Sequence, residues 1–330
     1  MQTVQRTLLL SMTIALLALT GCQRHSNSER YYLVSNNLKL AYWRTAADGF
    51  NKAAAEYHVK AFVVGPDTYD PQAELTALQQ AVAAKPAGIL ISVADAATFQ
   101  SQIDAAIDAG VPIITMDSDA PHSHRLFFIG TNNLEAGHLG GQRVVDKLPG
   151  GKGNVVFFSM PGQPNLDERF KGYQEAFSEH PGIKTVEVVD IKGESTAAFD
   201  KTEQYMTQTG PKKIDAFICL EASAGKEVGT VLKRDNAKDR LLIAMDIDPD
   251  TLSLIKDGVI DATIAQKPYT MGFIGLRALD QVFHDGPKTF RTDFSVDPFS
   301  PFPVFVDTGT AVVDKVNVDL YTNSANAAQK

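Results

Sequence analysis

The chain has 330 residues, of which 44% are hydrophobic and 21% charged, a composition that excludes a disordered or fibrous protein. Its net charge of -8 argues against a nucleic-acid partner or a direct electrostatic contact with an anionic membrane, because both need a basic patch. The length suits two lobes of about 100–200 residues each rather than one core.

The N-terminal segment predicts export. Arg6 precedes an apolar run from Leu8 to Leu19, and the run ends in Leu19-Thr20-Gly21-Cys22. A short positive start, about a dozen apolar residues and small residues at the end are typical of a secretory signal, not of a membrane span. We therefore expect a signal peptide over residues 1–21 and a polar tether over 22–30, with an uncleaved anchor or an ordinary signal peptide as the alternatives.

The cysteine at the cleavage point resembles the lipobox of bacterial lipoproteins. That resemblance implies cleavage before Cys22, acylation of the sulfur and the new amino group, and anchoring in a membrane of the cell envelope. The other cysteine, Cys219, lies in the apolar run 216–220, so we expect a buried thiol and no disulfide.

From Tyr31 onward, short β-branched runs alternate with helical patterns. Strands are predicted at Tyr31–Ser35, Lys60–Val64, Gly88–Ser92, Pro112–Met116, Phe127–Ile129, Asn154–Ser159, Thr185–Val189, Ala216–Leu220, Leu241–Met245 and Ala262–Ala265. Helices are predicted at Asp70–Ala84, Thr98–Ala109, Leu134–Lys147, Asp167–Glu179, Ser195–Thr209, Ala224–Arg234 and Tyr269–His284. Two series of strand–helix repeats predict an α/β protein with two doubly wound parallel-sheet lobes.

Ligands of open parallel sheets bind beyond the carboxyl ends of the strands, so the residues that follow each strand are the candidates for a site. These are Tyr42 and Trp43 after the first strand, then Asp117-Ser118-Asp119, Glu221, Asp246 and Gln266. Carboxylates accept hydrogen bonds, amides donate and accept, and aromatic faces stack on sugar rings, so this set matches a polyhydroxylated ligand. The alternative is that strand-end polar residues cap the next helix, which we favour for Asp248 and Ser195.

The other motifs in the sequence give little evidence of a function. His122 and His124 form an isolated pair in a polar loop, with no further residue to complete a metal site. The glycines of 137–141 do not follow a phosphate-binding pattern and indicate close helix packing instead. No nucleophile motif of a hydrolase is present. We expect no metal, no cofactor and no enzymatic activity.

Five stretches resemble the type I periplasmic sugar-binding proteins of the ribose-binding group. They are Gly110-Val-Pro-Ile-Ile-Thr-Met-Asp117, Asp167-Glu-Arg-Phe-Lys-Gly-Tyr173, Ala198-Phe-Asp200, Ala244-Met-Asp246 and Gly258-Val-Ile-Asp-Ala-Thr-Ile-Ala-Gln-Lys-Pro268. The resemblance implies a three-strand hinge with crossovers near 131–133, 266–268 and 307–309. The N-terminal lobe would then combine 31–131 with 267–306, and the C-terminal lobe 132–266 with 307–330.

The resemblance also implies roles. Asp117 is similar to the carboxylate that accepts from sugar hydroxyls, and Arg169 to the arginine that donates from the second lobe. Phe199 is similar to the second-lobe stacking aromatic, Tyr42 and Trp43 to its first-lobe counterparts, and Asp246 and Gln266 to the remaining contacts. Ser118 and Glu221 depart from the ribose pattern, which has an arginine and an asparagine there. That makes the cleft more acidic and argues against ribose itself; Asp-Ser-Asp is similar to rhamnose or furanosyl autoinducer binders.

We therefore predict a monomeric solute-binding lipoprotein of an ABC importer, which closes around a small sugar and presents it to the membrane permease. A ligand sensor that signals to a membrane receptor shares every one of these features. A transcriptional regulator of the same fold would need a DNA-binding segment where the signal peptide stands. A glycosidase would use Asp117 and Glu221 as its acid pair.

Overall fold

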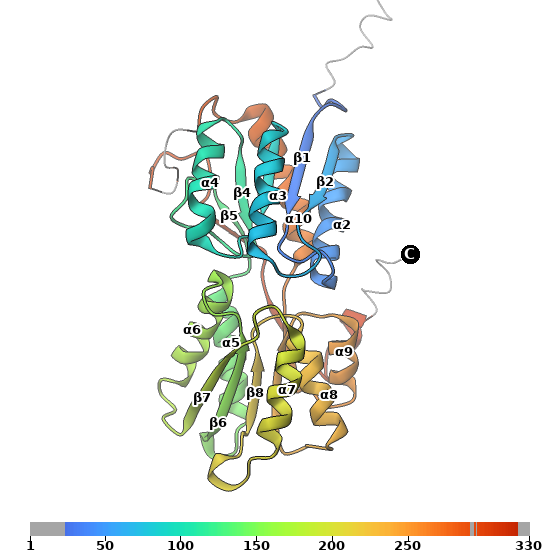
Figure 1. The fold of residues 1–330 in the computed structure, drawn as a ribbon, viewed down its shortest axis with the longest axis vertical. Helices are drawn as coiled ribbons and strands as arrows, with labels where there is room; N and C mark the ends of the chain where they lie inside the picture. The colour runs from blue at the N-terminus through green and yellow to red at the C-terminus, as the bar shows by residue number, and fades with distance from the viewer. Residues whose placement is uncertain (1–23, 291–293, 295, 323–330) are drawn as a thin grey trace, which may run out of the picture.

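The computed structural model describes residues 24–290, 294 and 296–322, so Cys22 and the whole predicted signal peptide, residues 1–21, lie outside the described residues. Two lobes lie end to end along the long axis, and each is built on a six-stranded sheet (Figure 1). This arrangement confirms the predicted α/β class with two doubly wound lobes. None of the described helices has the length and apolar character required to span a bilayer.

The first sheet has the strand order β11-β5-β4-β3-β1-β2, with every pair parallel. Its strands are β1 (Arg30–Val34), β2 (Lys60–Val64), β3 (Gly88–Ile91), β4 (Ile113–Met116), β5 (Phe128–Gly130) and β11 (Phe305–Asp307). Its helices are α2 (Ala41–Tyr57), α3 (Pro71–Ala83), α4 (Ala96–Asp108) and α10 (Pro268–Asp285). Helix α2 packs along α10 on one side of the sheet, and α3 and α4 lie on the other (Figure 1).

The second sheet has the order β12-β10-β9-β8-β6-β7, parallel except for β12 against β10. Its strands are β6 (Gly153–Ser159), β7 (Ile183–Asp190), β8 (Ala216–Cys219), β9 (Leu241–Met245), β10 (Ala262–Ala265) and β12 (Ala311–Asp314). Its helices are α5 (Asn133–Lys147), α6 (Pro164–Phe177), α7 (Ser195–Met206), α8 (Ala224–Arg234) and α9 (Pro249–Lys256). The short 3₁₀ helices η1 (Pro149–Gly151) and η2 (Gly210–Lys212) complete this lobe.

The chain passes between the two sheets three times, from β5 to α5, from β10 to α10 and from β11 to β12. The passages are hydrogen-bonded to one another. The Thr131 hydroxyl donates to Gln266 Oε1 at 2.9 Å, and the Thr308 amide donates to the Gly130 carbonyl at 2.8 Å. A link of three short, mutually bonded segments allows the lobes to rotate about it while each sheet stays intact.

The inner strands β3, β4, β8 and β10 are fully buried on both faces, as expected for parallel strands covered by helices. Cys219 is buried in strand β8, which confirms the expected buried thiol. One of the two helix-capping predictions is confirmed and the other is wrong. Asp248 caps α9 by accepting from the amides of Asp250 and Thr251, whereas Ser195 is the first residue of α7 and makes no side-chain cap. That expectation for Ser195 was wrong, because Glu194 holds the capping position.

Candidate functional site

A small cavity lies between the lobes at the carboxyl ends of the strands, with about 60 Å³ open to a water-sized sphere. Residues from both lobes and from the hinge line it. They are Asn36, Asn37, Leu40, Tyr42, Trp43, Tyr69, Asp117, Met160, Gln163, Asn165, Leu166, Arg169, Gly193, Glu221, Ala222, Ser223, Asp246 and Gln266. Seven of the nine residues predicted from the sequence are in this set. Strand ends of the two sheets therefore converge on one shared space between the lobes, as the position rule for parallel sheets requires.

Asp117 is the centre of the first-lobe wall. It follows β4 with a left-handed backbone (φ 63°), a conformation that aspartate tolerates better than most residues. The Tyr42 hydroxyl donates to its Oδ1 at 2.7 Å and the Ser92 hydroxyl to its Oδ2 at 3.1 Å. Burial raises the pKa of Asp117, while the charge of Arg169 and these hydrogen bonds act in the opposite direction.

Arg169 is the centre of the second-lobe wall and is 2% exposed. Its Nε donates to Asn133 Oδ1 at 2.9 Å, its Nη1 to the Leu220 carbonyl at 2.8 Å and its Nη2 to Gln266 Oε1 at 2.9 Å. A guanidinium has five N–H groups, so two remain beyond these three contacts with described residues. Because Arg169 lines the cavity, those two are available to a ligand.

Close packing of α5 on α6 places Arg169. A side-chain carbon on Gly137 would lie 2.1 Å from the Arg169 carbonyl, and one on Gly172 would lie 2.2 Å from the Leu134 carbonyl. Only glycine fits at these two points of contact. The structure thus confirms the prediction that the glycines of 137–141 serve helix packing, and this packing positions Arg169 beside the hinge.

Asp246 and Gln266 form the part of the wall nearest the hinge. Asp246 also has a left-handed backbone (φ 66°), so the same strand-end geometry recurs in both lobes. Gln266 Nε2 donates to Asp246 Oδ1 at 3.0 Å, while Gln266 Oε1 accepts from both Thr131 and Arg169. Gln266 therefore connects the hinge to the charged groups of the site.

Glu221 lines the cavity but also caps a helix. Its two carboxylate oxygens accept from the backbone amides of Ser223 and Ala224 at 2.7 and 2.6 Å, at the start of α8. Burial raises the pKa of Glu221, and these two amide bonds counteract the effect. Glu221 therefore caps helix α8 and also lines the cavity, so the capping alternative considered for strand-end residues applies to it as well.

The cavity is acidic. Three buried carboxylates, Asp117, Glu221 and Asp246, surround one buried guanidinium, and burial is the largest influence on the pKa of each carboxyl group. For Asp246 the pKa rises to about 7, against an opposing effect from Arg169. A ligand that brings hydrogen-bond donors would satisfy these oxygens without adding negative charge.

Two aromatic rings form the apolar part of the wall. Tyr42 and Trp43 lie in the first turn of α2, with ring centroids 5.2 Å apart and an interplanar angle of 80°. Both line the cavity, and both are almost fully buried. The near-perpendicular rings offer a flat face and an edge to a ligand ring.

Two predicted residues do not line the cavity. Ser118 is fully buried beside it. The prediction that Phe199 stacks on a ligand is not supported by this arrangement, since its ring lies 5.9 Å from the Arg234 guanidinium, between α7 and α8. Helix α7 begins at Ser195, and by Phe199 one turn of helix has directed the ring away from the strand ends.

The sequence interpretation missed three amides. Asn37 Oδ1, Gln163 Oε1 and Asn165 Oδ1 line the cavity, are buried and have no hydrogen-bond partner among the described residues. Asn165 Nδ2 donates across the lobes to Asp117 Oδ2 at 3.3 Å. The strand-end rule could have found them, because Asn37 follows β1 and Gly162-Gln163-Pro164-Asn165 follows β6. Buried polar oxygens are normally hydrogen-bonded, so these three oxygens are available to accept hydrogen bonds from a ligand.

A larger depression of about 1060 Å³ opens at the other end of the second lobe. Its lining includes Gly153, Leu241 and Asp261, which begin or precede β6, β9 and β10. It therefore lies at the amino ends of the strands, where open parallel sheets do not bind their ligands. We assign the site to the cavity between the lobes, at the carboxyl ends of the strands.

The raised pKa of Asp246 predicts a pH dependence of stability. In the unfolded chain the group ionises near its ordinary pKa of 3.8, but in the fold only near 7. Its stabilising contribution is complete below pH 3.8 and is lost as the pH rises toward 7, by about 1.4 kcal/mol per unit. Asp246→Asn should flatten the fall in unfolding free energy measured by urea titration at pH 5, 6 and 7 without sugar. Asp248→Asn, in the same loop, controls for removing a charge, and parallel slopes for wild type and Asp246→Asn would contradict the assignment.

Comparison with known proteins places this geometry in a family. The model of the periplasmic binding protein domain matches residues 31–286. The ribose import binding protein RbsB of Bacillus subtilis is 23% identical over 303 residues, covering 85% of this chain and 94% of that protein. The xylose/arabinose-binding protein XylF of Sulfolobus acidocaldarius is 24% identical over 273 residues, covering 78% of this chain and 64% of the length of that protein.

Solved structures agree. A sugar-binding protein of a sugar ABC transporter from Bacillus halodurans has a TM-score of 0.75 and 33% identity, covering 89% of this chain and all of that one. The arabinose-binding protein AraP of Geobacillus stearothermophilus has a TM-score of 0.71 and 30% identity, covering 89% of this chain and 99% of that one. The chain therefore belongs to the periplasmic binding protein family, as its resemblance to the type I sugar-binding proteins predicted.

Proposed function

We propose that this protein captures a monosaccharide, or a ligand of similar size and hydroxyl content, between its lobes and delivers it unchanged to an ABC permease in the membrane. The observation that carries the proposal is the polar cavity between the lobes, lined from both lobes by carboxylates, a guanidinium and amide oxygens without a partner among the described residues. The names of the relatives support it, because ribose, xylose and arabinose are all small sugars.

The cavity chemistry suits a neutral ring that carries donors. Each sugar hydroxyl can donate one hydrogen bond and accept others, so it can serve both the acceptors Asp117 and Asn165 and the donor Arg169. Tyr42 and Trp43 would contact the apolar C–H face of the ring. The excess of carboxylates favours a sugar or amino sugar over any anionic ligand. The small volume argues against an oligosaccharide.

Closure of the lobes would enclose the ligand. The Asn165–Asp117 hydrogen bond crosses between the lobes, and Gly193 of the second lobe lies against Tyr69 of the first. These contacts between the lobes are typical of a closed conformation. The three-segment hinge allows the lobes to rotate into an open conformation. Binding energy from both walls would then shift the population toward the closed shape that a transporter recognises.

A thermal-shift screen of aldoses, deoxy sugars, polyols and amino sugars tests the proposal. A ligand at 100 times its dissociation constant stabilises the fold by about 2.7 kcal/mol, which is a clear shift in Tm. We expect at least one neutral or amino sugar to stabilise the protein and to be recovered unchanged. Stabilisation only by charged acids, or turnover of a glycoside, would overturn the proposal. Glu221 is poorly placed for acid catalysis, because both its oxygens accept backbone amides.

Sensing is the second candidate function. The XylFII–LytSN complex contains a chain that matches this one with a TM-score of 0.77 and 25% identity over 87% of this chain. A protein of this fold thus occurs in a complex with another protein. Deleting the chain's own gene separates the two functions: loss of sugar uptake supports transport, whereas normal uptake with a lost transcriptional response to the sugar supports sensing.

We also propose that Cys22 carries the lipid that holds the protein at the membrane of the cell envelope. Cys22→Ser should move the protein from the membrane fraction to the soluble fraction, because the thioether-linked acyl chains supply the affinity for the bilayer. Cys219→Ser is the matched control, since Cys219 is buried in the second sheet and cannot be an anchor. Membrane attachment that persists in Cys22→Ser would rule out the anchor.

A further inference from the structure

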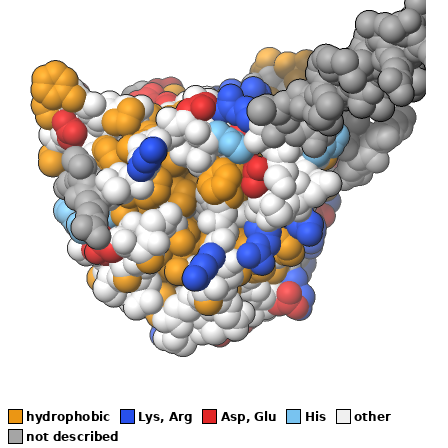
Figure 2. Space-filling view, turned by 90° about the horizontal axis from the view of Figure 1, so that it is seen from above, with side chains coloured by type: hydrophobic (Ala, Val, Ile, Leu, Met, Phe, Trp, Pro, Cys, Tyr) orange, Lys and Arg blue, Asp and Glu red, His pale blue; other side chains and the backbone are white. Residues whose placement is uncertain are grey.

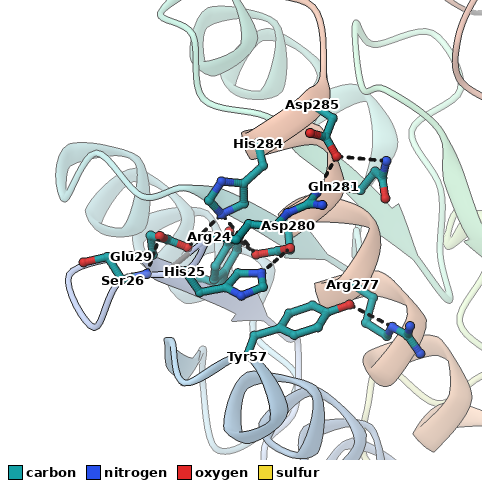
Figure 3. A network of polar contacts seen from close by, with 11 residues as sticks. Arg24, His25, Ser26, Glu29, Tyr57, Arg277, Asp280, Gln281, His284 and Asp285 are labelled. Carbon is teal, nitrogen blue, oxygen red and sulfur yellow. Dashed lines mark hydrogen bonds and ion pairs between the residues drawn. The ribbon is translucent and has the colours of Figure 1, made fainter. Parts of the chain in front are cut away.

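A second cluster of polar groups lies at the outer end of the first lobe, far from the sugar cavity. It consists of His25, Glu29, Asp280 and His284 and is drawn in Figure 3. Figure 2 looks onto this end of the molecule and shows histidine side chains (pale blue) next to acidic ones (red). None of the functions discussed above uses these residues.

The ligating atoms are already close together. His25 Nε2 lies 3.0 Å from Asp280 Oδ2, and His284 Nε2 lies 3.5 Å from Asp280 Oδ1 and 3.1 Å from Glu29 Oε2. The ligand atoms of His25, Asp280 and His284 all lie within 4.8 Å of one another. A tetrahedral ion with bonds of about 2.0–2.1 Å separates its ligand atoms by about 3.3 Å, so little rearrangement is needed to bind one.

The surroundings orient the four side chains. Asp280 and His284 are one turn apart on α10 and present their groups on the same side of the helix (Figure 3). The His25 ring stacks on Tyr57, with centroids 4.6 Å apart and planes at 8°. The Tyr31 hydroxyl donates to Asp280 Oδ1 at 3.1 Å, the kind of outer contact that holds a metal-binding carboxylate in place.

The charge of the cluster also favours a cation. The side chains of Glu29 and Asp280 are only 8% and 5% exposed. Among the described residues, no lysine or arginine forms an ion pair with either carboxylate; Asp280 pairs with both histidines and Glu29 with His284. A divalent cation would neutralise both carboxylates at once, and buried charges need such compensation.

We propose that His25, Asp280 and His284, with Glu29 as a fourth ligand, bind one divalent transition-metal ion of the Zn²⁺ type. Two imidazoles with two carboxylates suit zinc better than Ca²⁺ or Mg²⁺, which take oxygen ligands alone. The ion would fasten the segment that precedes β1, in which His25 stands only three residues after Cys22, to the last long helix of the first lobe.

Equilibrium dialysis of the purified protein against Zn²⁺, with the bound metal counted by mass spectrometry, tests the proposal. The wild type should retain about one zinc per chain. His284→Gln and His25→Gln should each weaken binding tenfold or more, as loss of a metal contact does. His122→Gln removes an exposed histidine from the same lobe and should bind like the wild type.

Testing two histidine variants separates the loss of zinc from the loss of the fold. His284 lies on a packed helix, whereas His25 precedes the first strand, so His25→Gln leaves the fold intact even if His284→Gln does not. Loss of zinc in His25→Gln, with an unchanged circular dichroism spectrum, supports the site. A wild type that retains no more zinc than His25→Gln, or a His122→Gln variant that loses it equally, would overturn the proposal.

Discussion

Replacing Arg169 with methionine should abolish sugar binding at any practical concentration. Among the described residues that line the cavity, Arg169 is the one cationic side chain, and the variant removes it together with the two N–H groups that its contacts within the protein leave for a ligand. Truncating one partner of a buried charged hydrogen bond costs about 2–5 kcal/mol, which corresponds to roughly a 30-fold to several-thousand-fold weaker affinity. Isothermal titration with the best sugar from the screen measures the loss.

Stability should fall as well, because Arg169 holds the wall together. Without the guanidinium, Asn133 Oδ1 and the Leu220 carbonyl lose the donor that Arg169 supplies, and Gln266 Oε1 retains only the Thr131 hydroxyl among donors in the described residues. Each unsatisfied buried acceptor costs about 1–3 kcal/mol. Asp117 and Asp246 would also lose the charge that opposes the rise of their pKa values. Urea unfolding should therefore show a lower midpoint for the variant.

Arg143→Met is the control for this experiment. Arg143 also forms ion pairs in the second lobe, with Asp261 and Asp314, but it lines the open depression at the far end of the sheet. It should lose some stability and no affinity. An unchanged dissociation constant for Arg169→Met would falsify the assignment of the cavity as the sugar site.

Continuous runs of buried apolar residues explain why the strands could be predicted from the sequence. All ten predicted strands occur within a few residues of their expected bounds, because parallel strands such as β3 and β8 are buried on both faces and form continuous apolar runs. The same logic located the site, since the positions after β4, β9 and β10 carry the polar residues that line the cavity.

Elements without such a local signal were missed. Helix α2 begins after Leu40, which makes no side-chain cap, so nothing in the sequence marks its start. Strand β11 has only three residues, is largely exposed, and pairs with β5 about 175 positions earlier. Its formation depends on tertiary contacts, which neither propensity nor periodicity encodes.

Two features of the site could not be read from the sequence for the same reason. Phe199 was placed by its motif, but its direction depends on where α7 begins and on the Arg234 guanidinium beside it. The partnerless amide oxygens of Gln163 and Asn165 became visible only when both walls of the cavity could be seen together. Motifs thus locate a site residue along the chain, while the helix register and the opposite lobe decide which way it points.

Substituting alanine for Gly193 should weaken sugar binding by hindering closure. A side-chain carbon at Gly193 would lie 2.5 Å from Tyr69 Cβ, which belongs to the other lobe. Open lobes have no such contact, so the overlap acts on the closed form. Overpacking of this kind costs about 1–3 kcal/mol, which predicts a 5- to 150-fold higher dissociation constant. Isothermal titration measures the affinity, and small-angle scattering with and without sugar reports the shape.

Gly258→Ala separates the contact between the lobes from backbone strain. Gly193 and Gly258 have nearly the same left-handed backbone, with φ of 76° and 73°, so alanine costs both a similar strain. No atom in the described part of the chain lies within 4 Å of a side-chain carbon at Gly258, however, and that variant should keep the wild-type affinity. If both alanine variants bind sugar equally well, the lobes must lie further apart around the ligand than they do in this structure. The affinity would then come from the contacts that each lobe makes with the ligand separately.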